Sequence, residues 1–149
     1  MKRTTAGGRG ILPIAVFAVT ALFFYWPVLV GGEILLPLDN LWTMLPWVGP
    51  PGAVPHNRLI SDMVLQNYPW KVILDQAVRQ RVLPLWNPYV MGGLPYLGTA
   101  QTGVLYPFTL LFVLLGPLKA YGWFCAFHQF LAASLTYRFA RRLEVGREG

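Results

Sequence analysis

The stretch from Ile11 to Val30, ILPIAVFAVTALFFYWPVLV, contains no charged residue and decides the fold of this chain. At about 1.5 Å per residue, a helix of this length crosses the roughly 30 Å hydrocarbon layer of a membrane. The composition agrees, because 55% of the 149 residues are hydrophobic and only 12% are charged, which is unusually apolar for a soluble domain. The sequence therefore predicts a transmembrane helix over residues 11–30.

A cleaved signal peptide is the alternative for this stretch, because basic residues precede it. However, its apolar run is longer than the roughly 7–15 residues that are usual in signal peptides. The chain after Val30 reads GGEILLP, without a small-x-small cleavage site. These features favour a retained membrane anchor.

A second apolar stretch, residues 118–140, predicts a second transmembrane helix, whereas residues 104–115 are too few to span a bilayer and predict an interfacial helix. Positive residues concentrate at both ends of the chain: Lys2, Arg3, Arg9, Arg138, Arg141, Arg142 and Arg147. Because such residues favour the cytoplasmic side, we expect segments 1–10 and 141–149 inside and residues 31–117 outside. The predicted fold class is an all-α polytopic membrane protein, in which two transmembrane helices flank a large external loop with interfacial helices.

The net charge of +6 does not predict a nucleic-acid partner. Most of the 12 Lys and Arg residues lie at the expected cytoplasmic ends, where topology and anionic lipid explain them. The single cysteine, Cys125, lies inside the second apolar stretch and cannot form a disulfide within the chain. It is interpreted as a packing residue, and membrane lipid is the expected partner.

Residues 69–82 of the external loop show a helical period of apolar positions and predict a helix, with Asn67 as its N-cap. On the polar side of this helix, Lys71, Asp75 and Arg79 are spaced four apart. A carboxylate at that spacing can pair with both cations. We therefore expect a structural role for Asp75.

Aromatic residues are frequent in the loop. Its tryptophans are typical of an aromatic belt at the membrane surface: Trp42, Trp47, Trp70 and Trp86. Trp86, Asn87 and Tyr89 could also form a binding platform, since an aromatic face packs on apolar C–H groups and an amide meets hydroxyls. The alternative is a rigid turn, because three prolines surround the pair Gly92–Gly93.

Two further carboxylates of the loop, Asp39 and Asp62, have no cation at helical spacing except Arg58, which precedes Asp62 in an expected turn. Either one could serve as a general base, or both could share a divalent metal such as Mg²⁺ or Mn²⁺. The structural alternative is that Asp62 or Ser61 caps a short helix at residues 63–67 and that Asp39 closes an Asx-turn with Asn40. The sequence leaves both possibilities open.

The ordered motifs of the loop resemble the N-terminal region of YfhO-like bacterial membrane proteins, which are relatives of the GT-C glycosyltransferases. The resemblance covers residues 31–147. Its strongest part is LPLWNPY at residues 83–89, and its other parts are Asp62, Gln66 and Pro69-Trp70 upstream and Gln101 and Tyr106-Pro107 downstream.

This resemblance implies a multi-pass protein of the bacterial inner membrane with a cytoplasmic N-terminus and further spans. The chain would then be the opening piece of a longer polypeptide, and the remainder of that polypeptide is an expected partner. It also implies transfer of a sugar from a polyprenyl-phosphate-linked donor to a cell-envelope acceptor. Asp62 is then the first candidate for the catalytic base, and Asp39 the second. The candidates for substrate binding are Arg58, Gln66, Trp70, Trp86, Asn87, Tyr89 and Gln101.

A cation is expected to meet the phosphate of the departing lipid, and Lys71, Arg79 and Arg81 are candidates beside Arg58. His56 and His128 show no metal-ligand spacing, and His128 is interpreted as a helix-packing residue. The alternative function is a non-catalytic membrane scaffold, or a carrier of lipid-linked sugar, which needs the aromatic surface but no carboxylate base.

Overall fold

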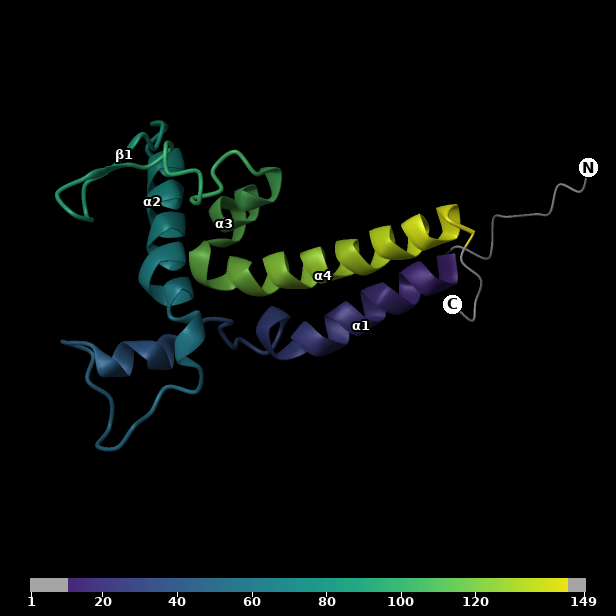
Figure 1. Cartoon of the computed structure of the whole chain (residues 1–149), viewed down its shortest axis with the longest axis horizontal. Helices are drawn as coiled ribbons and strands as arrows, with labels where there is room; N and C mark the ends of the chain where they lie inside the picture. Colours follow the sequence, from purple (N-terminus) through teal and green to yellow (C-terminus); the bar gives the residue numbers. More distant parts are fainter. Residues whose placement is uncertain (1–10, 145–149) are drawn as a thin grey trace, which may run out of the picture. The chain divides into compact units, whose positions relative to one another are not determined.

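The computed structural model describes residues 11–144, and these are mostly helical. They divide into two compact units (Figure 1). The described part of the first unit comprises residues 11–33 and 122–144, and the second unit comprises Ile34–Tyr121. The basic N-terminal segment 1–10 and Arg147, on which the expected topology partly rests, lie outside the described residues.

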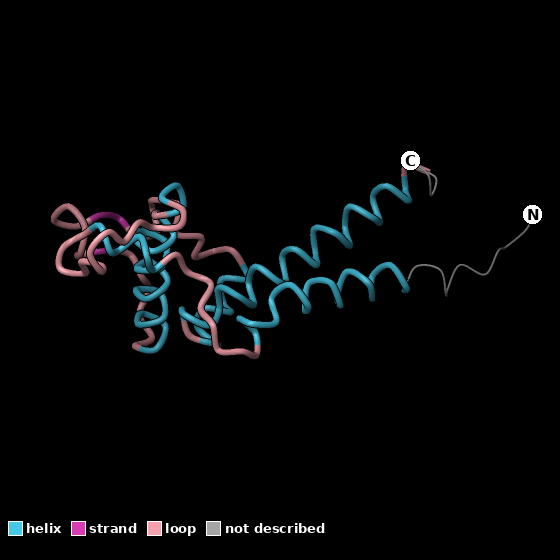
Figure 2. The backbone as a smooth tube through the Cα atoms, turned by 90° about the horizontal axis from the view of Figure 1, so that it is seen from below, coloured by secondary structure: helices cyan, strands magenta, loops and turns pink. Residues whose placement is uncertain are grey.

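The first unit is a pair of helices. Helix α1 spans Ile11–Leu29, and helix α4 spans Pro117–Arg142, so that its part from residue 122 onward belongs here. The two run side by side in opposite directions (Figure 1, Figure 2). The rings of Phe17 and Tyr137 meet edge to face with centroids 6.1 Å apart. Toward the other end, a Cβ on Gly122 would lie 3.2 Å from the Val28 Cβ, so the glycine allows close approach.

Helix α1 is the one helix of residues 11–144 that is both long and apolar enough to cross a membrane. Many of its large apolar side chains are exposed, among them Leu12, Val19, Phe23 and Phe24. Helix α4 contains the stretch predicted as the second span and is 26 residues long, but it does not meet the same test of apolarity. The described residues thus contain one candidate span rather than two.

The second unit is built from short elements. In chain order these are η1 (Leu38–Thr43), η2 (Arg58–Ile60), the π-helical turn η3 (Met63–Asn67), α2 (Tyr68–Arg79), β1 (Trp86–Asn87), β2 (Leu94–Pro95), η4 (Pro107–Thr109) and α3 (Leu110–Leu115). Strands β1 and β2 form an antiparallel hairpin, with Trp86 opposite Pro95 and Asn87 opposite Leu94.

Helix α2 differs from the helix predicted at residues 69–82. Asn67 occupies the predicted N-cap position of α2, but its backbone is helical and its side chain forms no capping hydrogen bond. The helical backbone begins before α2, because the π-helical turn η3 leads directly into it at Tyr68. At the other end Arg81 has a φ of 58°, a left-handed conformation that stops an α-helix. The interfacial helix predicted at residues 104–115 is also shorter, since α3 begins at Leu110 after a turn and η4.

The core of the second unit lies between α2, α3 and the segment after β2. Trp70, Leu74 and Tyr96 are buried together, and Ile73, Val104 and Val113 pack against them. The Tyr96 hydroxyl donates a hydrogen bond to the Trp70 carbonyl oxygen at 2.5 Å. This bond satisfies the one polar atom of a side chain that is only 1% exposed.

Lys71 belongs to this core and does not pair with Asp75. Its Nζ donates to the Thr102 carbonyl oxygen at 2.6 Å and lies 5.3 Å from the centre of the Phe112 ring. Burial lowers the pKa of Lys71. The prediction that Asp75 lies between two cations is therefore wrong in part: only Arg79 pairs with it, at 2.8 Å, because the Lys71 stem and its ammonium turn toward the core.

We expect the burial of the Tyr96 hydroxyl to make the folded protein less stable at alkaline pH. Burial raises the pKa of Tyr96 to about 12 from its ordinary value of 10.0. Between these values the unfolded chain has lost the proton and the folded chain has kept it, so stability falls as pH rises from about 10 to about 12, by up to about 3 kcal/mol. Denaturant unfolding in detergent micelles at pH 9.5 and 11.5 should detect this loss.

Tyr96→Phe should unfold more easily at pH 9.5, by about 1 kcal/mol for the lost hydrogen bond, but should lose less stability between the two pH values. Tyr89→Phe, at an exposed ring, is the matched control. The buried Lys71 makes a contribution of opposite sign to the pH dependence, because stability rises toward pH 10.5 as Lys71 loses its charge in the unfolded chain. This contribution is the same in the wild type and in Tyr96→Phe, so it cancels when the two are compared. An equal loss in wild type and Tyr96→Phe would contradict the assignment.

Candidate functional site

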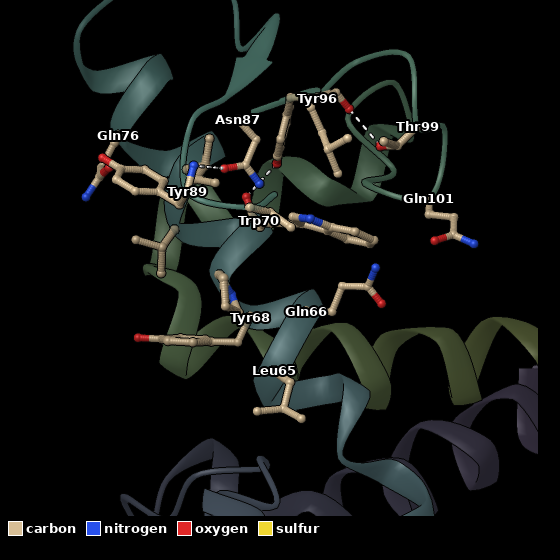
Figure 3. Close-up of a pocket in the computed structure, with 15 residues that line it drawn as sticks. Leu65, Gln66, Tyr68, Trp70, Gln76, Asn87, Tyr89, Tyr96, Thr99 and Gln101 are labelled. Atoms are coloured by element: carbon tan, nitrogen blue, oxygen red, sulfur yellow. Dashed lines mark hydrogen bonds between the residues drawn. The ribbon is translucent and has the colours of Figure 1, made fainter. Parts of the chain in front are cut away.

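A cavity of about 640 Å³ in the second unit lies along one side of η3 and α2, where the hairpin and the segment after β2 face it (Figure 3). Its lining is Leu65, Gln66, Tyr68, Pro69, Trp70, Val72, Ile73, Gln76, Asn87, Tyr89, Val90, Leu94, Tyr96, Thr99 and Gln101. We call it the α2 pocket. Its volume is within the usual range of small-molecule binding pockets.

None of the described residues that line the α2 pocket is charged. The polar groups of its lining are the carboxamides of Asn and Gln and the hydroxyls of Tyr and Thr. The rest of its wall is aromatic and aliphatic. No described residue forms a hydrogen bond with the side-chain amides of Gln66, Gln76 or Gln101, so these amides are open to a ligand. Such a lining suits a neutral ligand with both hydroxyl groups and apolar faces, and it offers no counter-charge for a phosphate.

The hairpin holds Asn87 and Tyr89 at the pocket. Asn87 is 3% exposed, and its Oδ1 accepts a hydrogen bond from the Tyr89 backbone N–H at 3.0 Å, which closes the turn after β1. Figure 3 shows this bond at the pocket wall. The Asn87 Oδ1 therefore has the structural role of the rigid-turn interpretation. The exposed Tyr89 ring stays available for contact with a ligand.

Trp86 lines another cavity, of about 340 Å³, to which Ile73, Gln76 and Tyr89 of the α2 pocket also contribute. Its indole packs on Gly93, where a Cβ would lie 2.5 Å from the Trp86 Nε1. Gly93 has a φ of 119°, which only glycine adopts easily. The pair Gly92–Gly93 is thus explained by the turn and by the indole that covers it.

The structure brings together part of the predicted site. Five of the seven candidate substrate-binding residues line the α2 pocket: Gln66, Trp70, Asn87, Tyr89 and Gln101. Trp86 lines the neighbouring cavity, and Arg58 is exposed at the start of η2 and lines none of the cavities described here. The two candidate catalytic residues, Asp39 and Asp62, are also outside the α2 pocket.

Asp39 has a structural partner. Its Oδ2 accepts a hydrogen bond from the His56 backbone N–H at 2.6 Å, and the neighbouring Asn40 donates from Nδ2 to the Asn57 carbonyl oxygen at 3.0 Å. In place of the Asx-turn considered for Asp39 and Asn40, the Asp39 carboxylate thus forms a hydrogen bond to a residue 17 positions later in the chain. Asp39 and His56 also line a separate, mostly apolar cavity of about 340 Å³.

Asp62 has no such partner. It occupies the N-cap position of η3, but its backbone is helical and its side chain forms no capping hydrogen bond. The carboxylate is exposed, and no described residue donates a hydrogen bond to it. The capping interpretation of Asp62 is therefore wrong, and the carboxylate is open to solvent one helical turn before Gln66.

The cation candidates are also distributed differently from the prediction. Lys71 is directed into the core, and Arg79 forms an ion pair with Asp75, whose hydrogen bond and charge raise the pKa of Arg79. Arg81 is exposed after α2. No group of three or more His, Cys, Asp or Glu residues within 11–144 is arranged to hold a metal ion. His128 Nδ1 lies 2.7 Å from the Phe124 carbonyl oxygen one turn earlier in α4.

Sequence reasoning missed several residues that line the α2 pocket: Tyr68, Gln76, Tyr96 and Thr99. Gln76 could have been found, because positions 69, 72, 73 and 76 share one face of a helix. Tyr96 and Thr99 could not, since the path of the chain after the hairpin brings them to α2 and no local period marks them. Comparison of the chain with protein-family models, with curated proteins and with solved structures found no match.

Proposed function

We propose that this chain is the N-terminal part of an integral membrane glycosyltransferase-like protein of the GT-C type. In this proposal, its external unit binds the sugar of a polyprenyl-phosphate-linked donor in the α2 pocket. The observation that supports it most is the α2 pocket itself, where amides and aromatic rings meet without any charged side chain. Such a lining fits the hydroxyl groups and C–H faces of a neutral sugar.

The proposed topology has two spans with both chain ends in the cytoplasm. In its support, α4 from Gly122 onward packs antiparallel to α1, with the Phe17–Tyr137 and Val28–Gly122 contacts near opposite ends of the pair. If α1 crosses the bilayer, a partner that follows it along most of its length crosses too. The arginines of α4 then return to the side where α1 begins, in agreement with the positive-inside rule.

The proposed reaction is an attack of an acceptor hydroxyl on the anomeric carbon of the donor sugar. The bond from that carbon to the lipid phosphate breaks, the phosphate leaves with the electron pair, and Asp62 takes the proton of the hydroxyl. In support, Asp62 is exposed and unpartnered on the helical path that leads to Gln66 in the pocket. A phosphate outside the uncharged pocket would meet a cation from elsewhere, such as Arg58 or a later part of the polypeptide.

A specific observation also favours the second candidate function, a carrier that holds lipid-linked sugar without chemistry. The described lining of the α2 pocket contains no carboxylate. A binding protein needs none, whereas a transferase must bring Asp62 to the substrate. The two candidates make different predictions for Asp62→Asn.

The proposed site predicts a loss of donor binding when the pocket amides are removed. Gln66→Leu combined with Gln101→Leu keeps the approximate volume but removes two sets of donors and acceptors. Each hydrogen bond contributes about 0.5–1.5 kcal/mol, so we expect binding to weaken by roughly tenfold or more. The measurement is titration of the full-length protein in vesicles with polyprenyl-phosphate-linked hexose, followed by tryptophan fluorescence.

Gln80→Leu is the matched control, because Gln80 directly follows α2 and lies outside the α2 pocket. Titration with polyprenyl phosphate alone separates the sugar from the lipid. Unchanged hexose binding in the double variant, with an intact circular dichroism spectrum, would reject the α2 pocket as the sugar site.

A further inference from the structure

The end of η1 and the segment that leads from it to η2 contain a surface that the proposed function does not use. Residues 41–55, LWTMLPWVGPPGAVP, contain no charged residue, and we call them the apolar loop. Its large side chains are not packed into the core: Leu45 is 84% exposed and Val48 is 67% exposed. Trp42, Trp47 and Val54 are exposed too.

The apolar loop is a defined structure that is closed at its base. The Asp39–His56 and Asn40–Asn57 hydrogen bonds described above join the two chain segments where the loop begins and ends. Inside the loop, the Gly49 N–H donates to the Trp42 carbonyl oxygen at 3.2 Å. A Cβ on Gly49 would lie 2.6 Å from the Trp42 Cβ, so the chain folds back closely on that side chain. The loop thus presents its apolar residues as a preformed projection.

From these observations we infer that the apolar loop inserts into the interface of the bilayer in which α1 is anchored. The inference rests on the membrane anchoring in the proposed function. Only 12 residues separate the end of α1 at Leu29 from Trp42, so the chain holds Trp42 within about 45 Å of the helix end. Indole rings prefer the headgroup region, because their body is apolar and their N–H stays hydrated.

The absence of charge from residues 41–55 decides in favour of lipid over water as the environment of the loop. Inserting a segment with Lys, Asp or Glu side chains would require their dehydration, which is costly. Inserting the apolar loop removes Leu45, Val48 and both indoles from water without that cost. The backbone groups at its base already have partners through Asp39 and Asn40. The loop would therefore be a second point of attachment beside the anchor.

The test places a fluorescent probe on the loop of the whole chain in phosphatidylcholine–phosphatidylglycerol vesicles. The chain carries Cys125→Ser and either Val48→Cys or the control Gln80→Cys, each labelled with an environment-sensitive nitrobenzoxadiazole dye. We expect nitroxide-labelled lipid to quench the probe at 48 several-fold more than the probe at 80, and aqueous iodide to do the reverse. Leu45→Asp, at an exposed position, should restore access of iodide to position 48.

Two results would overturn the inference. If iodide quenches both probes equally and nitroxide lipid quenches neither, the loop is in water. If the probe at 48 is protected from both quenchers, a protein surface covers the loop instead of lipid. Extraction of the whole chain from the vesicles at alkaline pH would instead overturn the anchoring itself, so failure of the anchor is distinguished from failure of the loop.

Discussion

Asp62→Asn is expected to lower sugar transfer by the full-length protein about 10²–10⁴-fold, which is the usual contribution of a general base. The amide is nearly the same shape as the carboxylate but cannot take the proton of the acceptor hydroxyl. Because Asp62 is exposed and makes no capping hydrogen bond, the substitution should leave the fold and the binding of donor unchanged. The measurement is transfer of radiolabelled sugar from a polyprenyl-phosphate donor in vesicles, with donor binding determined in parallel.

Asp75→Asn is the matched control, since Asp75 pairs with Arg79 in α2 and takes no part in the proposed reaction. Asp39→Asn is informative for a different reason, because its amide oxygen can still accept the hydrogen bond from the His56 N–H. A loss with Asp39→Asn as large as that with Asp62→Asn would indicate that the two carboxylates act in one site. Unchanged transfer in Asp62→Asn would remove this residue from the mechanism.

Trp70→Ala is expected to destabilise the external unit by about 3–5 kcal/mol, the range for removing a buried tryptophan. The Trp70 side chain belongs both to the core with Leu74 and Tyr96 and to the wall of the α2 pocket. The substitution should therefore reduce stability and donor binding together. Chemical unfolding of the whole chain in detergent micelles, followed by near-ultraviolet circular dichroism, measures the first effect.

Leu74→Ala separates the two effects. Leu74 is buried in the same core but does not line the pocket, so we expect a loss of about 2–5 kcal/mol with binding preserved under conditions where the variant is folded. Were Trp70→Ala to unfold at the same denaturant concentration as the wild type, the assignment of Trp70 to the core would be wrong.

The sequence predicts the elements of this fold whose signal is local. Residues 11–30 are recognisable because length and absence of charge are enough to identify a candidate span, and α2 is recognisable because its apolar positions recur with a helical period. The end of α2 at Arg79 is not visible in that pattern, since Val82 continues the apolar period while Arg81 has a left-handed backbone. The π-helical turn before α2 has no sequence signal of its own.

The candidate site was predictable where motif residues lie on one element or turn, as Gln66, Trp70 and Asn87 do. The partners of charged side chains were predicted less well, because the spacing of residues along a helix does not determine which of two possible partners a flexible side chain contacts. Lys71 has the spacing of a surface ion pair with Asp75, yet it reaches the Thr102 carbonyl oxygen and the Phe112 ring. Asp39 likewise bonds to a backbone group 17 residues away, a contact that no local pattern encodes.

The π-helical turn η3 fixes the phase between Asp62 and the rest of the helical segment. Such a turn holds one residue more than an α-helical turn and so rotates the preceding chain by about 100° relative to the following helix. Shortening residues 63–67 by a single position would leave the pocket residues from Tyr68 onward in place, yet direct the carboxylate of residue 62 to another side of the helix. The number of residues between Asp62 and the Tyr68-Pro69-Trp70 sequence therefore sets the direction of the carboxylate, independently of which residues fill the turn.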